Sequence, residues 1–174
     1  MSYSAGFIQQ LFKLLPAAPG KIGNIPIGAV AYSSLGTSAV HVAGSIYVSE
    51  YYLYAPKRAS GIGLLNGAIV GTDNLIYAIY ASDGTLLGNT ATAGTLSAGA
   101  NAFQEIALVS ALNLRPGRYF LALQCNGTTA TTRRIAVSTY LNFASVTAGT
   151  FGTLPAITPP TTTAADTGPI GYVY

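Results

Sequence analysis

The side chains suited to acid–base or nucleophilic chemistry are few and scattered. They are one histidine, one cysteine and five acids: His41, Cys125, Glu50, Asp73, Asp83, Glu105 and Asp166. A carboxylate pair drawn from Asp73, Asp83 and Glu105 would suit glycoside hydrolysis, in which one acid protonates the leaving group. Asp73 and Asp83, however, stand in turn sequences, where aspartate commonly accepts hydrogen bonds from backbone amides. We therefore expect structural acids and a protein that is not an enzyme.

The remaining reactive groups give no stronger signal for catalysis or ligand binding. His41 is the candidate general base, but Cys125 is distant in sequence and no nucleophile motif surrounds it. We expect His41 in a structural or interface position and Cys125 as a small buried side chain. Scattered carboxylates favour no calcium cage, because that ion needs several oxygen ligands. The chain has no glycine-rich phosphate loop ending in Lys-Ser or Lys-Thr. The sequence thus predicts no cofactor and no metal site.

Tyrosine is the more suggestive residue type. Tyr47, Tyr51, Tyr52 and Tyr54 fall within one strand-like segment, and strand alternation places Tyr51 and Tyr52 on opposite faces. An outward-facing tyrosine suits a protein interface or a sugar-binding platform, because it combines apolar area with a hydroxyl group. Core packing in a chain without tryptophan is the other interpretation. We predict a partner surface that includes Tyr51, Tyr52 and Tyr54.

Composition limits the classes of protein that fit. The chain has 174 residues, half of them hydrophobic, and 7% are charged, against about 25% in a typical domain. Its basic residues are dispersed, so we expect no nucleic-acid partner and place them at loop ends and strand edges. No apolar run is long enough to span a membrane. One unpaired cysteine and the lack of a signal-peptide pattern predict synthesis in a reducing cytoplasm.

The elements that must position these residues are strands. Strand-like runs, rich in β-branched and aromatic residues, cover residues 45–54, 62–70, 75–80, 85–87, 103–108, 112–114, 118–124 and 134–140. Turn signals separate them, among them Ser82-Asp83-Gly84, Arg115-Pro116-Gly117 and Asn126-Gly127. Helical patterns are absent between the strands. We predict an all-β protein, a single antiparallel β-sandwich or jelly roll over residues 41–143.

The two ends of the chain differ from this block. Residues 1–40 are predicted to be an N-terminal arm with a short amphipathic helix, because Phe7, Ile8, Leu11 and Phe12 recur at helical spacing. Residues 144–174 are predicted to be a low-complexity C-terminal arm that ends in a strand-like alternation. We expect the four N-terminal residues, together with Tyr172 and Tyr174, to contact a partner.

One block resembles a known group of proteins. It comprises Ala81-Ser82-Asp83-Gly84-Thr85-Leu86-Leu87, then Ala93-Gly94-Thr95, then residues 114–123 (LRPGRYFLAL) and a turn at Asn126-Gly127. The order of strands and turns over about residues 62–138 is similar to the β-sandwich modules of tailed-bacteriophage virion proteins, including capsid decoration (cement) proteins. These motifs are turns and strands and carry no catalytic signature.

The resemblance implies a non-enzymatic capsid decoration protein. Such a protein would stabilise the phage head by bridging major capsid subunits, would form a homo-oligomer (a trimer at a local three-fold axis), and would lie on the capsid surface after synthesis in the host cytoplasm. Multiple weak contacts through the arms would give avidity. The alternative is a receptor- or glycan-binding module of a tail or head fibre that uses the tyrosines. A carbohydrate-active enzyme is the third hypothesis.

Overall fold

A computed structural model describes residues 22–25, 31–136 and 143–174. The described residues form strands and one short 3₁₀ helix, Tyr32–Ser34. The strands are β1 (Ile22–Gly23), β2 (Thr37–Val40), β3 (Ile46–Leu53), β4 (Lys57–Leu65), β5 (Asn74–Ala81), β6 (Leu86–Asn89), β7 (Thr95–Leu96), β8 (Phe103–Leu114), β9 (Gly117–Cys125), β10 (Thr131–Arg134), β11 (Ala144–Thr147) and β12 (Gly171–Val173).

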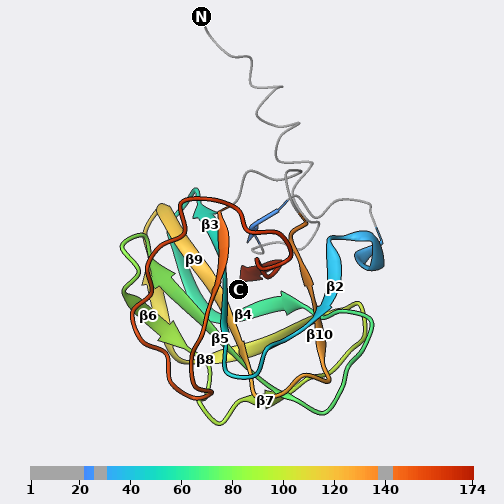
Figure 1. Ribbon diagram of the computed structural model, residues 1–174. Coiled ribbons are helices and arrows are strands. Elements are labelled where there is room, and N and C mark those ends of the chain that lie inside the picture. Colours follow the sequence, from blue (N-terminus) through green and yellow to red (C-terminus); the bar gives the residue numbers. More distant parts are fainter. Residues whose placement is uncertain (1–21, 26–30, 137–142) are drawn as a thin grey trace, which may run out of the picture.

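Two antiparallel sheets face each other as a sandwich (Figure 1). One sheet has the strand order β1-β12-β4-β8, and the other has the order β11-β3-β9-β5-β6, with β7 also paired to β5. A separate two-stranded ribbon joins β2 to β10. The predicted all-β sandwich is confirmed. Strand β9, predicted from the run at 118–124, is central to its sheet and is flanked by β3 and β5.

The inner faces of the two sheets form one hydrophobic core. Every long strand contributes to it, and its buried aromatic members are Tyr47, Tyr51 and Tyr77. Leu64 of β4 and Leu121 of β9 are fully buried there and come from opposite sheets. This burial is the main driving force for the pairing of the sheets, at about 25 cal/mol per Å² of apolar surface.

The outer faces of both sheets are also covered. On the six-stranded sheet, Val48, Tyr80 and Phe120 pack with Ile157 and the partly buried Leu154 of the C-terminal segment. That segment, orange to red in Figure 1, runs across the outside of the sheet. Because residues on both sides of β3, β5 and β9 are buried, these strands carry apolar side chains on both faces and do not alternate regularly with polar residues.

A third hydrophobic cluster covers the four-stranded sheet. Its buried members are Ile25, Leu35, Leu65, Ile135, Ile170 and Tyr172. Most of these residues come from segments expected to be parts of arms or loops. They pack on the outside of β4, and β1 pairs with β12 at the edge of the sheet. Residues 22–25, 31–40 and 143–174 therefore belong to the packed structure, since they bury apolar side chains against their own sheets.

Some element boundaries differ from the predictions. Residues 103–108 and 112–114 belong to one strand, β8, which contains a bulge: Ala59 pairs with Leu112, but Gly61 pairs with Ala107. Within this bulge Leu108 stays in the inner core, whereas Val109 is 71% exposed. The strand predicted at 134–140 overlaps β10 only at Arg134, where β10 ends; residues 135–136 are not in a strand, and residues 137–142 lie outside the described residues. The predicted N-terminal helix also lies outside them.

Gly84 joins the β5–β6 turn to the C-terminal segment. It has a φ of 90°, and a Cβ at this position would collide with the backbone carbonyl oxygen of Ile157. The Ile157 amide in turn donates to the Gly84 carbonyl at 3.0 Å. A side chain here would strain the turn and also lift the covering segment from the sheet.

We therefore expect Gly84→Ala to lower the free energy of unfolding by about 2 kcal/mol or more. Gly99 is the matched control, because it has a similar φ of 82° and its Cβ would meet only Ala102 Cβ at 3.3 Å. Gly99→Ala should cost about 1 kcal/mol, from backbone strain alone. Urea unfolding of both variants measures the difference, and equal losses would contradict the role of the covering segment.

Candidate functional site

Asp73 is a structural acid. Its carboxylate accepts hydrogen bonds from the Thr129 amide at 2.7 Å, the Ala130 amide at 2.7 Å and the Thr129 hydroxyl at 2.8 Å. Burial by itself would raise the pKa of Asp73, but these hydrogen bonds outweigh it and hold the pKa below its usual value. Asp73 thus holds the loop after β9 against the start of β5. Its role is structural, but its partners come from a distant segment and not from its own turn.

The other acids are also engaged with their own chain. Asp83 Oδ1 accepts from the Thr85 amide at 2.9 Å, which forms the predicted turn. Buried Glu50 pairs with Arg118, with 2.6 Å between Oε1 and Nε, and its other oxygen accepts from the Phe143 amide. Glu105 accepts a hydrogen bond from the Tyr172 hydroxyl at 2.8 Å. Asp73, Asp83 and Glu105, from which the hypothetical carboxylate pair was drawn, thus each bind a different group of their own chain.

His41 is buried beside the two-stranded ribbon. Its Nδ1 lies 3.1 Å from the Ala130 carbonyl oxygen, so this nitrogen carries the proton and donates. Nε2 lies 3.1 Å from the Thr132 hydroxyl and accepts from it. Burial, with a contribution from the positive charge of Arg134, lowers the pKa of His41 to about 4. His41 is therefore neutral near pH 7 and has a structural role. The sequence predicts either a structural or an interface position for it, and the structure shows the first.

Cys125 is free and buried, as predicted. Its Sγ lies 3.6 Å from Asp73 Oδ2, and burial raises its pKa to about 11. The protonated thiol is therefore the form present near neutral pH, and a weak nucleophile. Its sulfur is 3.4 Å from the Gly127 carbonyl oxygen, so the thiol packs within the same loop that Asp73 holds.

Two arginines that the sequence places at the surface are buried instead. Arg134 packs over the Tyr47 ring at 3.9 Å and donates to the Val40 carbonyl at 2.7 Å. Arg133 donates to Asn101 Oδ1 at 2.7 Å and to the Gly36 carbonyl. Each arginine bridges the ribbon to a neighbouring segment. The expectation that these two residues lie exposed at strand edges is wrong, because their donors satisfy carbonyl groups inside the fold.

The structure separates the tyrosines predicted to contact a partner. Tyr54 is 76% exposed and Tyr52 is 45% exposed, so both are accessible. Tyr51 is fully buried in the inner core, where burial raises its pKa. The Tyr51 side chain is therefore not accessible at the surface of the protein. Alternation along β3 accounts for this separation, because Tyr51 faces the opposite sheet and Tyr52 faces outward.

Tyr172 and Tyr174 lie on the outer side of the four-stranded sheet. Tyr172 pairs with Gly63 across β12 and β4, and a Cβ on Gly63 would fall 2.6 Å from the Tyr172 ring. A Cβ on Gly61 would likewise collide with the Tyr174 ring. The two glycines let these rings lie flat on the sheet. Tyr172 is buried, and Tyr174 is partly exposed. The predicted contact residues Phe7, Ile8, Leu11 and Phe12 lie outside the described residues.

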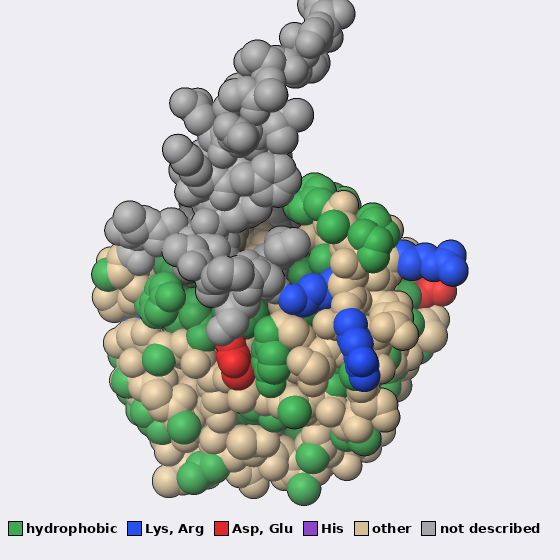
Figure 2. Space-filling model, turned by 180° about the vertical axis from the view of Figure 1, so that it is seen from behind, with side chains coloured by type: hydrophobic (Ala, Val, Ile, Leu, Met, Phe, Trp, Pro, Cys, Tyr) green, Lys and Arg blue, Asp and Glu red, His purple; other side chains and the backbone are tan. Residues whose placement is uncertain are grey.

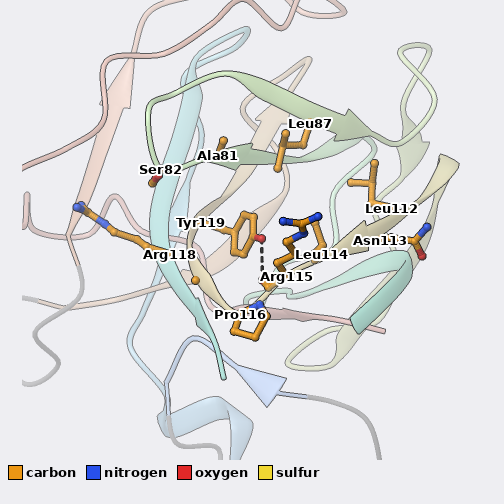
Figure 3. Close-up of a pocket in the computed structure, with 11 residues that line it drawn as sticks. Ala81, Ser82, Leu87, Leu112, Asn113, Leu114, Arg115, Pro116, Arg118 and Tyr119 are labelled. Carbon is orange, nitrogen blue, oxygen red and sulfur yellow. Dashed lines mark hydrogen bonds between the residues drawn. The ribbon is translucent and has the colours of Figure 1, made fainter. Parts of the chain in front are cut away.

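A cleft of about 470 Å³ opens at one end of the sandwich, between the β5–β6 turn and the junction of β8 and β9 (Figure 3). Leu87, Leu112, Leu114 and Tyr119 supply its apolar lining. The remaining lining residues are Ala81, Ser82, Asn113, Arg115, Pro116, Gly117 and Arg118. The Tyr119 hydroxyl donates to the Arg115 carbonyl at 2.7 Å, which supports the turn. The sequence analysis identified this turn but not the cleft, because the walls of the cleft come from three separate segments of the chain.

The fold and these contacts define an all-β sandwich whose reactive side chains have structural roles. No family model, curated protein or solved structure matches the chain. Within the described ranges, no three His, Cys, Asp or Glu side chains gather in a way that could hold a metal ion. In that same part of the chain, no helix has the length and apolarity needed to cross a membrane.

Because burial lowers the pKa of His41, we expect the stability of the protein to fall as the pH decreases. It is the only histidine in the chain. The folded protein keeps it neutral down to about pH 4, whereas an unfolded chain takes up the proton near the ordinary histidine pKa of 6.5. The unfolded state therefore binds more protons between these values, and stability falls as the pH decreases. We expect a loss of about 2–3 kcal/mol between pH 7 and pH 4, measured by urea unfolding.

His41→Gln is the control for this titration. Its amide group can still bond to the Ala130 carbonyl and the Thr132 hydroxyl, but it does not titrate. The variant should show a flatter profile between about pH 6.5 and pH 4.5. An equally steep profile in the variant, or a flat one in the unaltered protein, would rule out His41 as the group responsible.

Proposed function

We propose that this protein is a non-enzymatic bacteriophage virion protein that decorates the capsid and stabilises the head by bridging major capsid subunits. The observation that carries the proposal is the use of the reactive side chains: His41, Asp73 and Glu50 are buried and hydrogen-bonded to their own fold. The resemblance of the strand-and-turn block to phage virion modules supplies the biological context.

The surface of the sandwich suits binding to a protein shell. Few charged side chains interrupt the face in Figure 2, on which uncharged and hydrophobic residues predominate. Burying such a surface has a small desolvation cost, and the resulting contact depends little on salt. A homotrimer at a local three-fold axis would present several copies of this surface at once, which raises avidity. We place the protein on the outer surface of the capsid, after synthesis in the host cytoplasm.

One exposed apolar patch is a specific candidate for the capsid contact. Val40, Val42 and Ile69 are each more than half exposed. Val40 and Ile69 flank Thr131, which pairs with Val40 and donates its amide proton to the Ile69 carbonyl, and Val42 follows Val40 by two residues. Strand β10 is bridged to Asn66 and Pro169 as well as paired with β2, which leaves β2 at the edge of the ribbon. An uncharged edge strand with exposed apolar residues in and beside it favours contact with another protein.

A receptor- or glycan-binding role in a tail or head fibre is the second candidate function. The exposure of Tyr52 and Tyr54 at the end of β3 favours it, because an accessible aromatic ring can stack on a sugar. Whole-cell or glycan-array binding by Tyr54→Ala protein, compared with the unaltered protein, tests this role. Equal binding to host cells by both proteins would contradict a platform centred on Tyr54.

The number of copies per particle distinguishes the two functions. Quantitative mass spectrometry of purified virions gives the ratio of this chain to the major capsid protein. A decoration protein that covers the shell should approach a fixed stoichiometry with that protein, whereas a fibre module should be present at a small fraction of it. We expect the former. Absence of the chain from purified particles would contradict both functions.

Two changes test which part of the chain makes the capsid contact. Val42→Glu places a charge in the exposed patch and should weaken attachment to undecorated capsids by about tenfold or more. Val109→Glu, on the exposed bulge of β8, is the matched control and should bind normally.

Deletion of residues 1–20 removes Phe7, Ile8, Leu11 and Phe12 but none of the contacts described above, and should also weaken attachment. Normal attachment by both the Val42→Glu protein and the deletion protein would overturn this assignment of the contact.

A further inference from the structure

We propose that the cleft at the junction of β8 and β9 binds a carboxylated sugar, a hexuronic acid residue. This inference goes beyond the proposed capsid-decoration function, which assigns no small ligand to the sandwich. The cleft lies at an end of the sandwich, where the inner hydrophobic core reaches the surface between the two sheets. Its volume, about 470 Å³, is within the range of small-ligand sites and accommodates one or two sugar rings.

The charged residues that line the cleft favour an anionic ligand. The cleft is lined by two arginines and by no acidic residue. Arg118 is already paired with Glu50 at 2.6 Å and points away from the other lining residues (Figure 3). Arg115 is exposed, and no carboxylate of the described residues pairs with its guanidinium group. A planar guanidinium binds a carboxylate through two parallel hydrogen bonds, so Arg115 supplies the anchor for the acid group.

The position of Arg115 is well supported by the surrounding structure. Pro116 follows it in the turn, and the Tyr119 hydroxyl holds the Arg115 carbonyl at 2.7 Å. The Arg115 side chain and the Tyr119 ring project into the same cleft in Figure 3. The backbone that carries the cation is therefore preorganised, which reduces the entropy lost when a ligand binds.

The rest of the lining matches a sugar better than a simple anion. Leu87, Leu112 and the Tyr119 ring offer apolar area against which the C–H face of a pyranose can pack. Ser82 lies on the rim and is exposed, so its hydroxyl is available to a ring hydroxyl of a sugar. The Asn113 side chain points away from the other lining residues (Figure 3). An apolar wall, a neutral hydroxyl and one cation together favour a carboxylated pyranose.

The probe for this site is methyl β-D-glucuronide, titrated into the full chain and followed by amide shifts in two-dimensional NMR. We expect saturable shifts at Arg115, Arg118 and Tyr119. The methyl ester of the probe lacks the negative charge, and acetate lacks the ring. Each should bind at least about tenfold more weakly than the glucuronide if carboxylate and ring both contribute. Acetate or inorganic phosphate binding as tightly as the glucuronide would overturn the assignment to a sugar.

Two variants with the fold preserved complete the test. Arg115→Gln should weaken glucuronide binding by about tenfold or more, and Leu87→Glu should do the same by opposing the carboxylate across the cleft. Arg58→Gln is the matched control: Arg58 is also exposed and pairs with Asn113 between β4 and β8, but it does not line the cleft. Unchanged affinity in Arg115→Gln, an equal loss in Arg58→Gln, or no shifts at millimolar glucuronide would each overturn the proposal.

Discussion

The whole structure depends on covering both sheets on both faces. A two-layer sandwich ordinarily buries one face of each sheet and leaves the other to water, but here β3, β5 and β9 carry apolar side chains on both sides. The C-terminal segment covers one outer face through Ile157 and Leu154, and the cluster around Ile170 and Tyr172 covers the other. This requirement accounts for a hydrophobic, weakly charged sequence without a membrane-length apolar run. The segments near the two ends are thus part of the fold.

Polar side chains hold these covering segments in register. Gln124 on β9 donates to the carbonyls of Gly44 and Thr150, and its oxygen accepts from the Gly152 amide. Asn24 donates to the Pro169 carbonyl and accepts from the Gly171 amide, which joins β1 to the segment before β12. A backbone without regular pairing needs such partners once it is buried. Many of the few charged and amide residues of the chain are therefore used inside the fold, and the surface remains largely neutral.

Many polar side chains bond inside the fold, whereas the exterior remains largely uncharged. The acids and the histidine support the backbone of the protein itself, and contacts made by an uncharged surface depend little on salt. The cleft beside Arg115 differs from the rest of the surface, because an arginine without a carboxylate partner adjoins apolar side chains there. The sandwich thus presents a largely uncharged surface, which we propose serves assembly, and one charged, concave position at its end.

Local patterns in the amino-acid sequence are sufficient to predict the all-β class, the main strands β3, β5 and β9, and the turns at Asp83 and Arg115, because these features depend on local propensity and turn chemistry. The turn sequence at Asp73 and the single cysteine indicate structural roles for Asp73 and Cys125, but the partners of Asp73, Thr129 and Ala130, come from a distant segment. Three features arise only in the assembled fold: Arg133 and Arg134 are buried, Tyr51 is in the core while Tyr52 is exposed, and residues 143–174 pack on the sheets. The cleft likewise combines residues from separate segments. Burial and long-range pairing are properties of the assembled sheets, so local sequence patterns do not specify them.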